Sequence, residues 1–234
     1  MKVLVVVPTH REAASLGAGV EPFVCGTGKG LGDAVAARLA ADRPEVVLLA
    51  GYCGALDPSM AAGGVILARH VLAPGQPEIA PDRLLLEEVR KQLHKKHFPF
   101  VFSRLLTVER PVARKARKLA LWNEFGAAGV DMETYAVAGA AAAAGLPWLA
   151  VRTVVDTSKQ TLPRAVAKWG GEGDTRAIAR DALRHPLQWA AYVRLARQER
   201  RARLALARAI PVLLEAIAGA KVVEAIPVVE SNRG

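Results

Sequence analysis

The chain has 234 residues, of which 52% are hydrophobic and 23% charged, and its formal net charge is +10 at pH 7. This length and composition are typical of a single globular domain with a sizeable core, and they exclude an intrinsically disordered chain. The two cysteines, Cys25 and Cys53, form no Cys-x-x-Cys motif, which argues against a zinc site or a disulfide framework and favours a reducing compartment.

The positive charge raises the question of a nucleic-acid partner. Only 5% of the residues are aromatic, and no basic stripe alternates with aromatic residues, as stacking of single-stranded bases would need. The arginines are instead spread along several predicted helices. We therefore predict no nucleic-acid partner. A nucleic-acid-binding module stays as an alternative that rests on net charge alone.

The apolar run near the start, residues 3–8, is too short for the core of a secretory signal, and charged residues follow at once. This run predicts a first buried strand. The longest run without charge, residues 134–151, is divided by Gly145 and Pro147 into a helix and a strand. We therefore expect no transmembrane segment, no metal site and a cytoplasmic protein.

Short β-branched runs alternate with helical patterns along the whole chain. Strands are predicted at 2–7, 21–25, 45–51, 64–72, 100–107, 127–131 and 148–155. Helices are predicted at 31–42, 82–95, 111–125, 133–144, 174–184 and 187–217, the last with a kink at Pro211. Continuous apolar runs such as residues 46–50 indicate strands that are covered on both faces.

This pattern predicts an α/β fold: a single-domain three-layer sandwich in which helices flank a twisted, mixed but largely parallel sheet. We assign residues 1–218 to this domain. Residues 219–234 show no helical period and are predicted to form a C-terminal tail.

Two glycine-rich turns follow predicted strands. The cluster at residues 26–32 lies between a strand and a helix, but it fits neither the GxGxxG dinucleotide motif nor the Gly-Lys-Ser/Thr ending of a P-loop. The segment Gly51-Tyr52-Cys53-Gly54 ends the most apolar strand, where glycines would let a flat ligand approach the backbone. In both places an ordinary tight turn fits the sequence equally well.

Acidic residues gather where predicted strands end. Asp131 and Glu133 come where a short apolar strand turns into a helix of small residues, and the next strand ends at Arg152 and Asp156. Ligands of open α/β sheets bind outside the carboxyl ends of the strands. Two acids and a guanidinium at such a place suggest chemistry on a polyhydroxylated substrate whose leaving group must be protonated.

Glu12 follows the first strand directly. Taken alone, it is most simply a negative charge that complements the N-terminus of a helix. It gains interest beside Glu133 and Asp156, because neighbouring strands can deliver groups into one crevice.

The segments 130–133 and 151–156, with the alanine-rich helix between them, carry a family resemblance. Over about residues 1–185 the chain resembles the superfamily of purine nucleoside and uridine phosphorylases and 5′-methylthioadenosine/S-adenosylhomocysteine nucleosidases. The glycine turns at 26–30 and 51–56 fall where that family has its own. The resemblance implies a nucleoside phosphorylase-like fold and cleavage of the N-glycosidic bond of a small nucleoside, without a metal or organic cofactor.

The resemblance also implies roles for single residues. Asp156 matches the acid that protonates the departing purine, and Glu133 matches the carboxylate that holds the ribose hydroxyls. Met132 would lie under the sugar, while Arg152 would position the attacking group or orient Glu133. The further residues that we assign to substrate binding are Asp131, Tyr52, Cys53, Gly54 and Val108.

The residue after the first strand separates the two classes of the family. Phosphorylases tend to have an arginine there that holds phosphate, whereas nucleosidases have a glutamate that orients water. Glu12 occupies this place, so we predict hydrolysis of a 5′-modified purine nucleoside, such as methylthioadenosine or S-adenosylhomocysteine, with adenine as the base. In the phosphorylase alternative phosphate is a co-substrate, and Arg11, Gly28 and Lys29 would bind it.

Several residues depart from the family pattern. Tyr52 replaces a serine or threonine, Val155 replaces a serine before the acid, and the loop at 107–112 lacks the aromatic residue that stacks on the base. These departures motivate another alternative, a non-catalytic nucleoside-binding protein.

Residues 105–108 and 185–189, together with 130–133, are most similar to the hopanoid-associated branch of the family. That similarity implies removal of adenine from an adenosylated lipid. The last predicted helix carries a dense series of arginines: Arg194, Arg197, Arg200, Arg201, Arg203 and Arg208. Its basic face is either solvated or in peripheral contact with an anionic membrane. The resemblance further implies a homo-oligomer, with a dimer favoured.

Overall fold

The structure of the protein, a computed structural model, describes residues 1–17, 19–28, 30–163, 165–166, 180–181, 183–185 and 188–220. Seven strands lie within these residues: β1 (Val3–Val7), β2 (Phe23–Val24), β3 (Val46–Ala55), β4 (Val65–Leu72), β5 (Val101–Thr107), β6 (Ala127–Asp131) and β7 (Trp148–Asp156). The helices there are α1 (His10–Ala13), α2 (Leu31–Asp42), α3 (Arg83–Lys95), α4 (Lys115–Phe125), α5 (Thr134–Ala143) and α8 (Trp189–Gly219).

The strands form one mixed sheet that closes on itself over part of its width. β2, β1, β3 and β7 lie side by side and parallel, and β4, β5 and β6 form a second parallel set. The two sets meet through antiparallel pairs, β4 with β7 and β6 with β3. Five strands therefore form a ring, and β1 and β2 extend it on one side. The predicted mixed, largely parallel sheet is confirmed.

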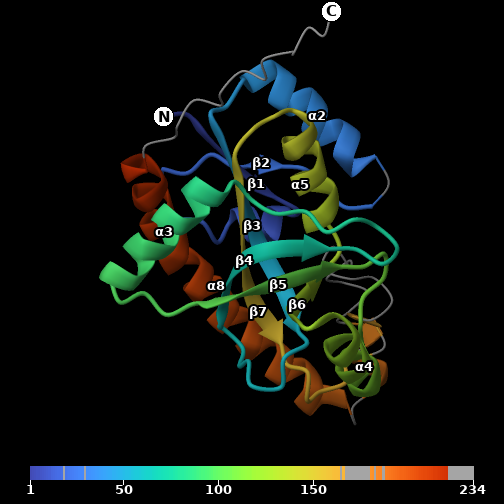
Figure 1. Ribbon diagram of the computed structural model, residues 1–234. Helices are drawn as coiled ribbons and strands as arrows, with labels where there is room; N and C mark the ends of the chain where they lie inside the picture. The colour runs from blue at the N-terminus through green and yellow to red at the C-terminus, as the bar shows by residue number, and fades with distance from the viewer. Residues whose placement is uncertain are drawn as a thin grey trace, which may run out of the picture.

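Helices cover the sheet on two sides. α2 and α5 pack together in one hydrophobic cluster with the strands, and α3 and α8 pack together in a second cluster. Figure 1 shows α2 and α5 to one side of the strands and α3 and α8 to the other. The predicted sandwich of helices around a sheet is thus confirmed. The separate helix α4 covers β6, where Leu121 joins a smaller cluster with Val130.

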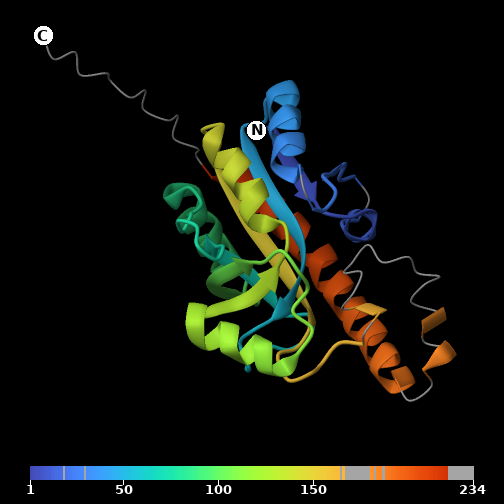
Figure 2. The ribbon, with the colours of Figure 1, turned by 90° about the vertical axis from the view of Figure 1, so that its right-hand side faces the viewer.

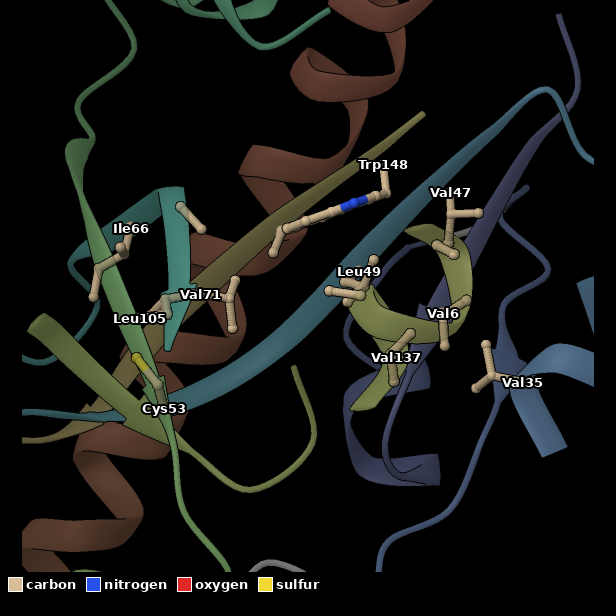
Figure 3. Packing of buried hydrophobic residues seen from close by; sticks show 14 of the residues in the cluster. Val6, Val35, Val47, Leu49, Cys53, Ile66, Val71, Leu105, Val137 and Trp148 are labelled. Carbon is tan, nitrogen blue, oxygen red and sulfur yellow. The ribbon is translucent and has the colours of Figure 1, made fainter. Parts of the chain in front are cut away.

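The interior of the strand ring is tightly packed. Figure 3 shows Cys53, Ile66 and Leu105 converging from β3, β4 and β5. A Cβ atom added at Gly129 of β6 would lie 2.8 Å from the Ile66 side chain and 3.0 Å from the sulfur of Cys53. A residue without a side chain is therefore required at this place, because β6 crosses β3 close to the core.

Most predicted elements occur with small changes of boundary. β3 continues to Ala55, because its last residues pair with β6. α4 begins at Lys115 and not at 111, since the residues after Pro111 stay extended up to Arg114. The short helix α1 was not predicted. The predicted helix 174–184 lies mostly outside the described residues.

α8 is a single helix of 31 residues that passes through Pro211 without ending (Figure 2). Of the predicted tail, residues 221–234 lie outside the described part of the chain, and the proposed boundary at 218 stays a prediction. No helix among the described residues has the length and apolar character needed to cross a membrane.

Candidate active site

A cavity of about 470 Å³ opens beside β1, β3 and β6. This volume lies in the range of small-molecule sites. Its walls come from the turn after β1, the end of β3, the β6–α5 turn, the loop after β5 and the inner face of α8. The lining residues used below are Thr9, Arg11, Glu12, Tyr52, Cys53, Gly54, Val108, Pro111, Val112, Asp131, Met132, Glu133, Leu195, Ala196 and Glu199.

Glu12 is fixed at the cavity by the turn that follows β1. It forms a capping box with Thr9, whose N–H and hydroxyl donate to its Oε2 over 3.0 and 2.8 Å. The N–H of Tyr52 in β3 donates to Oε1 over 2.7 Å. Burial raises the pKa of Glu12, and the charge of Arg152 opposes the rise. The result is a buried carboxylate held by neutral donors from two elements.

Arg152 lies fully buried behind the cavity. Its Nε is 2.8 Å from Asp131 Oδ2, and its guanidinium donates to the hydroxyl of Thr134 and, over 3.0 Å, to the carbonyl of Ala50. These partners come from β6, α5 and β3. Arg152 therefore holds three elements in place, and its charge acts on the carboxylates around it.

Gly51 explains how Glu12 and Arg152 come together. A Cβ atom at this position would lie 2.0 Å from Nη1 of Arg152 and 2.5 Å from Oε1 of Glu12. The glycine is thus required by the two charged side chains that pack over it. The sequence had suggested a place for a flat ligand, whereas the structure places a guanidinium and a carboxylate there.

Asp131 lines the cavity, but its oxygens already have partners. Oδ1 accepts from Thr107 over 2.8 Å, and Oδ2 accepts from the Thr134 hydroxyl and from Arg152. This geometry fits a carboxylate that positions Arg152 better than the predicted direct contact with substrate. Thr107 and Thr134 were missed by the sequence analysis, because single hydroxyl residues near strand ends carry no distinguishing pattern.

Glu133 and Met132 form the rim between β6 and α5. Both line the cavity, and the Met132 N–H donates to Glu133 Oε2 over 3.3 Å. Burial, together with the negative charge of Asp131, raises the pKa of Glu133 to about 7, against the opposing effect of Arg152. Glu133 can therefore change its charge near neutral pH.

Asp156, the last residue of β7, is buried next to Gly54, which lines the cavity, while Asp156 itself is not among the lining residues. Its Oδ1 is 3.1 Å from the point where a Cβ of Gly54 would lie. Its Oδ2 pairs with the ammonium of Lys118 from α4. Burial raises the pKa of Asp156, and Lys118 opposes this rise.

Lys118 was missed by the sequence analysis, which assigned no role to the basic residues of the predicted helix 111–125. A signal was present, since Lys118 precedes the buried Leu121 by three residues and shares its helix face.

Tyr52, Cys53 and Val108 were also predicted to bind substrate, and the structure places each in a different environment. Tyr52 lines the cavity, and its hydroxyl shares a 2.6 Å hydrogen bond with Ser15, while burial raises its pKa. The thiol of Cys53 packs in the core, where burial raises its pKa. Val108 contributes to the apolar wall.

Of the three residues predicted for phosphate binding, two lie within the described structure. Arg11 lines the cavity and forms an ion pair with Glu199 of α8 over 2.9 Å. Gly28 is exposed in a left-handed turn and does not line this cavity. Lys29 lies outside the described residues.

Comparisons with known proteins agree with this architecture. A family model described as "Phosphorylase superfamily" matches residues 9–181. Futalosine hydrolase from Helicobacter pylori superposes with a TM-score of 0.70 at 14% identity, over 92% of this chain and 97% of that protein. The 5′-methylthioadenosine/S-adenosylhomocysteine nucleosidase of the same organism gives 0.70 at 15% identity, over 92% and 98%.

S-adenosylhomocysteine nucleosidase from Streptococcus pyogenes gives a TM-score of 0.67 at 18% identity, over 92% of this chain and 96% of that protein. A search of curated proteins found no match. At these identities the structures establish the fold alone, while the family model covers most of the chain. The chain therefore belongs to the phosphorylase superfamily.

Proposed function

We propose that this protein hydrolyses the N-glycosidic bond of a purine nucleoside. The observation that carries the proposal is Glu12, a buried carboxylate held at the cavity by Thr9 and Tyr52. A carboxylate in this place can orient water and accept its proton. Arg11, the nearest cation in sequence, is paired with Glu199, which makes it a poorer candidate for holding phosphate.

The other buried groups fit the remaining steps of such a reaction. Glu133 faces the cavity and, when ionised, accepts hydrogen bonds from ribose hydroxyls. As the C1′–N bond breaks, its electron pair moves to the base. The base takes up a proton that Asp156 provides. The sugar cation that develops at C1′ is stabilised by the negative charges of the cavity. The chemistry uses water and side chains, so we propose no metal or organic cofactor.

Two of the similar structures support hydrolysis over phosphorolysis. They are named a nucleosidase and a futalosine hydrolase, and both superpose over more than nine-tenths of this chain. Phosphorolysis of a purine nucleoside stays the alternative if Arg11 leaves Glu199 to bind phosphate. A cytoplasmic homodimer that binds a small nucleoside completes the proposal. A catalytically inactive nucleoside-binding protein is the further alternative.

The 5′ substituent of the substrate faces an apolar environment in this proposal. Val108, Pro111 and Val112 form one wall of the cavity, and Leu195 and Ala196 of α8 form another. These walls fit an alkylthio group, as in methylthioadenosine.

The outer surface of α8 favours a second candidate, an adenosylated lipid. Trp189, Val193 and Leu204 are each at least half exposed on this helix, which also carries six arginines from Arg194 to Arg208. Apolar side chains among cations are the pattern of a helix that lies on an anionic bilayer. We expect the protein to bind anionic vesicles in a salt-sensitive way and not to bind neutral vesicles. Equal binding to both kinds of vesicle would remove this candidate.

The deciding experiment measures base release from methylthioadenosine, S-adenosylhomocysteine, futalosine, adenosine and inosine, each with and without phosphate. Release that does not depend on phosphate and yields free sugar is the expected result. Formation of ribose 1-phosphate would instead assign a phosphorylase. Binding of these nucleosides without any release would favour the non-catalytic alternative.

A further inference from the structure

Lys118 is an unusual residue for the interior of a protein. It lies on α4 and is 0% exposed, so its ammonium has lost all contact with bulk water. A buried charge is costly unless partners satisfy it. Its position next to the predicted proton donor therefore calls for a chemical explanation.

The contacts of Lys118 are directional. Its Nζ donates to Asp156 Oδ2, to the carbonyl of Thr157 over 2.9 Å and, over 3.5 Å, to the carbonyl of Gln160. Three acceptors thus surround a group that has three N–H bonds to give. The ammonium is held in one orientation, with one proton aimed at Asp156.

Asp156 connects this lysine to the cavity. Oδ2 is on the lysine, while Oδ1 lies against Gly54, a residue of the cavity wall. A carboxylate can link two sites when it accepts a proton from one and then, as a carboxyl group, gives that proton to the other. Because Gly54 has no side chain, its backbone at the cavity wall lies close to Oδ1.

An acid that donates a proton must be neutral when it does so, but the positive charge of an adjacent ammonium favours the ionised form of the acid. The two requirements conflict. Burial raises the pKa of Asp156 and Lys118 opposes the rise. The charge of Asp156 contributes to the raised pKa of the buried Cys53 thiol of β3. Lys118 is the main charged neighbour of Asp156.

We propose, on the basis of the proposed function, that Lys118 is a positioning residue that supplies through Asp156 the proton taken up by the leaving base. The C1′–N bond breaks and its electron pair stays on the base. Lys118 gives a proton to the Asp156 carboxylate at Oδ2 and is left as a neutral amine, and the carboxyl group formed in this way turns and gives that proton to the base. Water adds its hydroxide to C1′, and its other proton goes to Glu12.

The test compares Lys118→Arg and Lys118→Met with Lys115→Met, a change at an exposed lysine of the same helix. Arginine keeps the positive charge but does not give up a proton in proteins. We expect kcat for base release to fall about 100-fold or more in both Lys118 variants at every pH, as loss of a proton donor does. KM should change little, and Lys115→Met should behave as the parent.

A role in charge balance alone predicts different results. Lys118→Arg would then keep the parent kcat. Lys118→Met would keep activity and move the alkaline limb of its pH profile upward, because the pKa of Asp156 rises without the lysine. Either of these results overturns the proposal.

A second measurement needs neither a folded Lys118 variant nor turnover. The infrared difference between the parent and Asp156→Asn at pH 7 should show the loss of a carboxylate band. Loss of a protonated carboxyl band would overturn the proposal, because Asp156 would then hold its own proton. If the parent released no base from any nucleoside, the proposed function would fail, while the spectrum would still decide the state of the pair.

Discussion

The carboxylates of Glu12 and Asp156 are both buried beside β3, yet different partners hold them. Glu12 receives hydrogen bonds from neutral donors, the backbone and hydroxyl of Thr9 and the N–H of Tyr52. Asp156 pairs directly with the ammonium of Lys118. Burial raises the pKa of both acids, so burial does not distinguish them. The difference teaches that neighbours can give two buried acids different roles: in the proposed mechanism Glu12 takes a proton and Asp156 passes one on.

The strongest way to break this comparison is Asp156→Asn. Asparagine cannot relay a proton, so base release should fall by about 10²–10⁴-fold or more, while nucleoside affinity stays within a few-fold. Single-turnover release together with calorimetric binding measures the two effects separately. Turnover of this variant at the parent rate would remove Asp156 from the mechanism.

Glu12→Gln tests the other acid of the comparison, the proposed acceptor of a proton from water. Glutamine keeps one oxygen, which can accept from Thr9 or from Tyr52 but not from both, and it cannot take a proton from water, so kcat should fall about 10²–10³-fold. Glu124→Gln, at an exposed glutamate of α4, is the matched control. Because only the attack by water should be lost, an added strong nucleophile such as azide is expected to restore part of the rate. A parent-like rate in Glu12→Gln would refute its role.

Gly51 and Gly54 lie beside the two acids, and the effects of an alanine at each position on stability can be compared. Gly51→Ala would place a methyl group 2.0 Å from Arg152 and 2.5 Å from Glu12, whereas Gly54→Ala would approach Asp156 to only 3.1 Å. We expect the first change to lower the free energy of unfolding by about 3 kcal/mol and the second by less than about 1 kcal/mol. Urea unfolding measures both. Equal losses would contradict the tight packing of Arg152 over Gly51.

Glu133 extends the comparison of buried acids to the effect of pH on the stability of the protein. Its folded-state pKa of about 7 lies above the ordinary value of 4.5, so the unfolded chain releases this proton more easily than the folded one. The resulting penalty on stability is absent below about pH 4.5, grows as the pH rises to 7 and is constant above. Glu133→Gln should therefore raise Tm more at pH 8 than at pH 4.5. An equal change at both pH values would show that Glu133 titrates normally.

Much of the fold was predictable because it depends on local patterns. Runs such as residues 46–50 show buried strands, and the alternation of strands with helices indicates a sheet with helices on both faces. The closure of the strand ring was not predictable in this way. It depends on the pairing of Gly54 with Val130, and such long-range register leaves no periodic trace in either segment.

The candidate site was predictable where acids follow strands, as Glu12, Glu133 and Asp156 do, and where a family resemblance gave them roles. The partners of these acids were not. Thr134 begins a helix of mostly small residues, and Lys118 is one of several basic residues at the start of α4, so only the three-dimensional packing singles them out. Gly51 was noticed for its freedom near a ligand, while its actual neighbours are Arg152 and Glu12.

The position of α8 along the chain has a consequence for synthesis. One wall of the cavity is built from residues 192–199, and the ion pair of Arg11 with Glu199 joins the beginning of the chain to this last helix. All seven strands of the described sheet leave the ribosome before α8 does. A nascent chain can thus fold its sheet early, in the order in which domains form during translation, but it gains a complete pocket only when α8 docks.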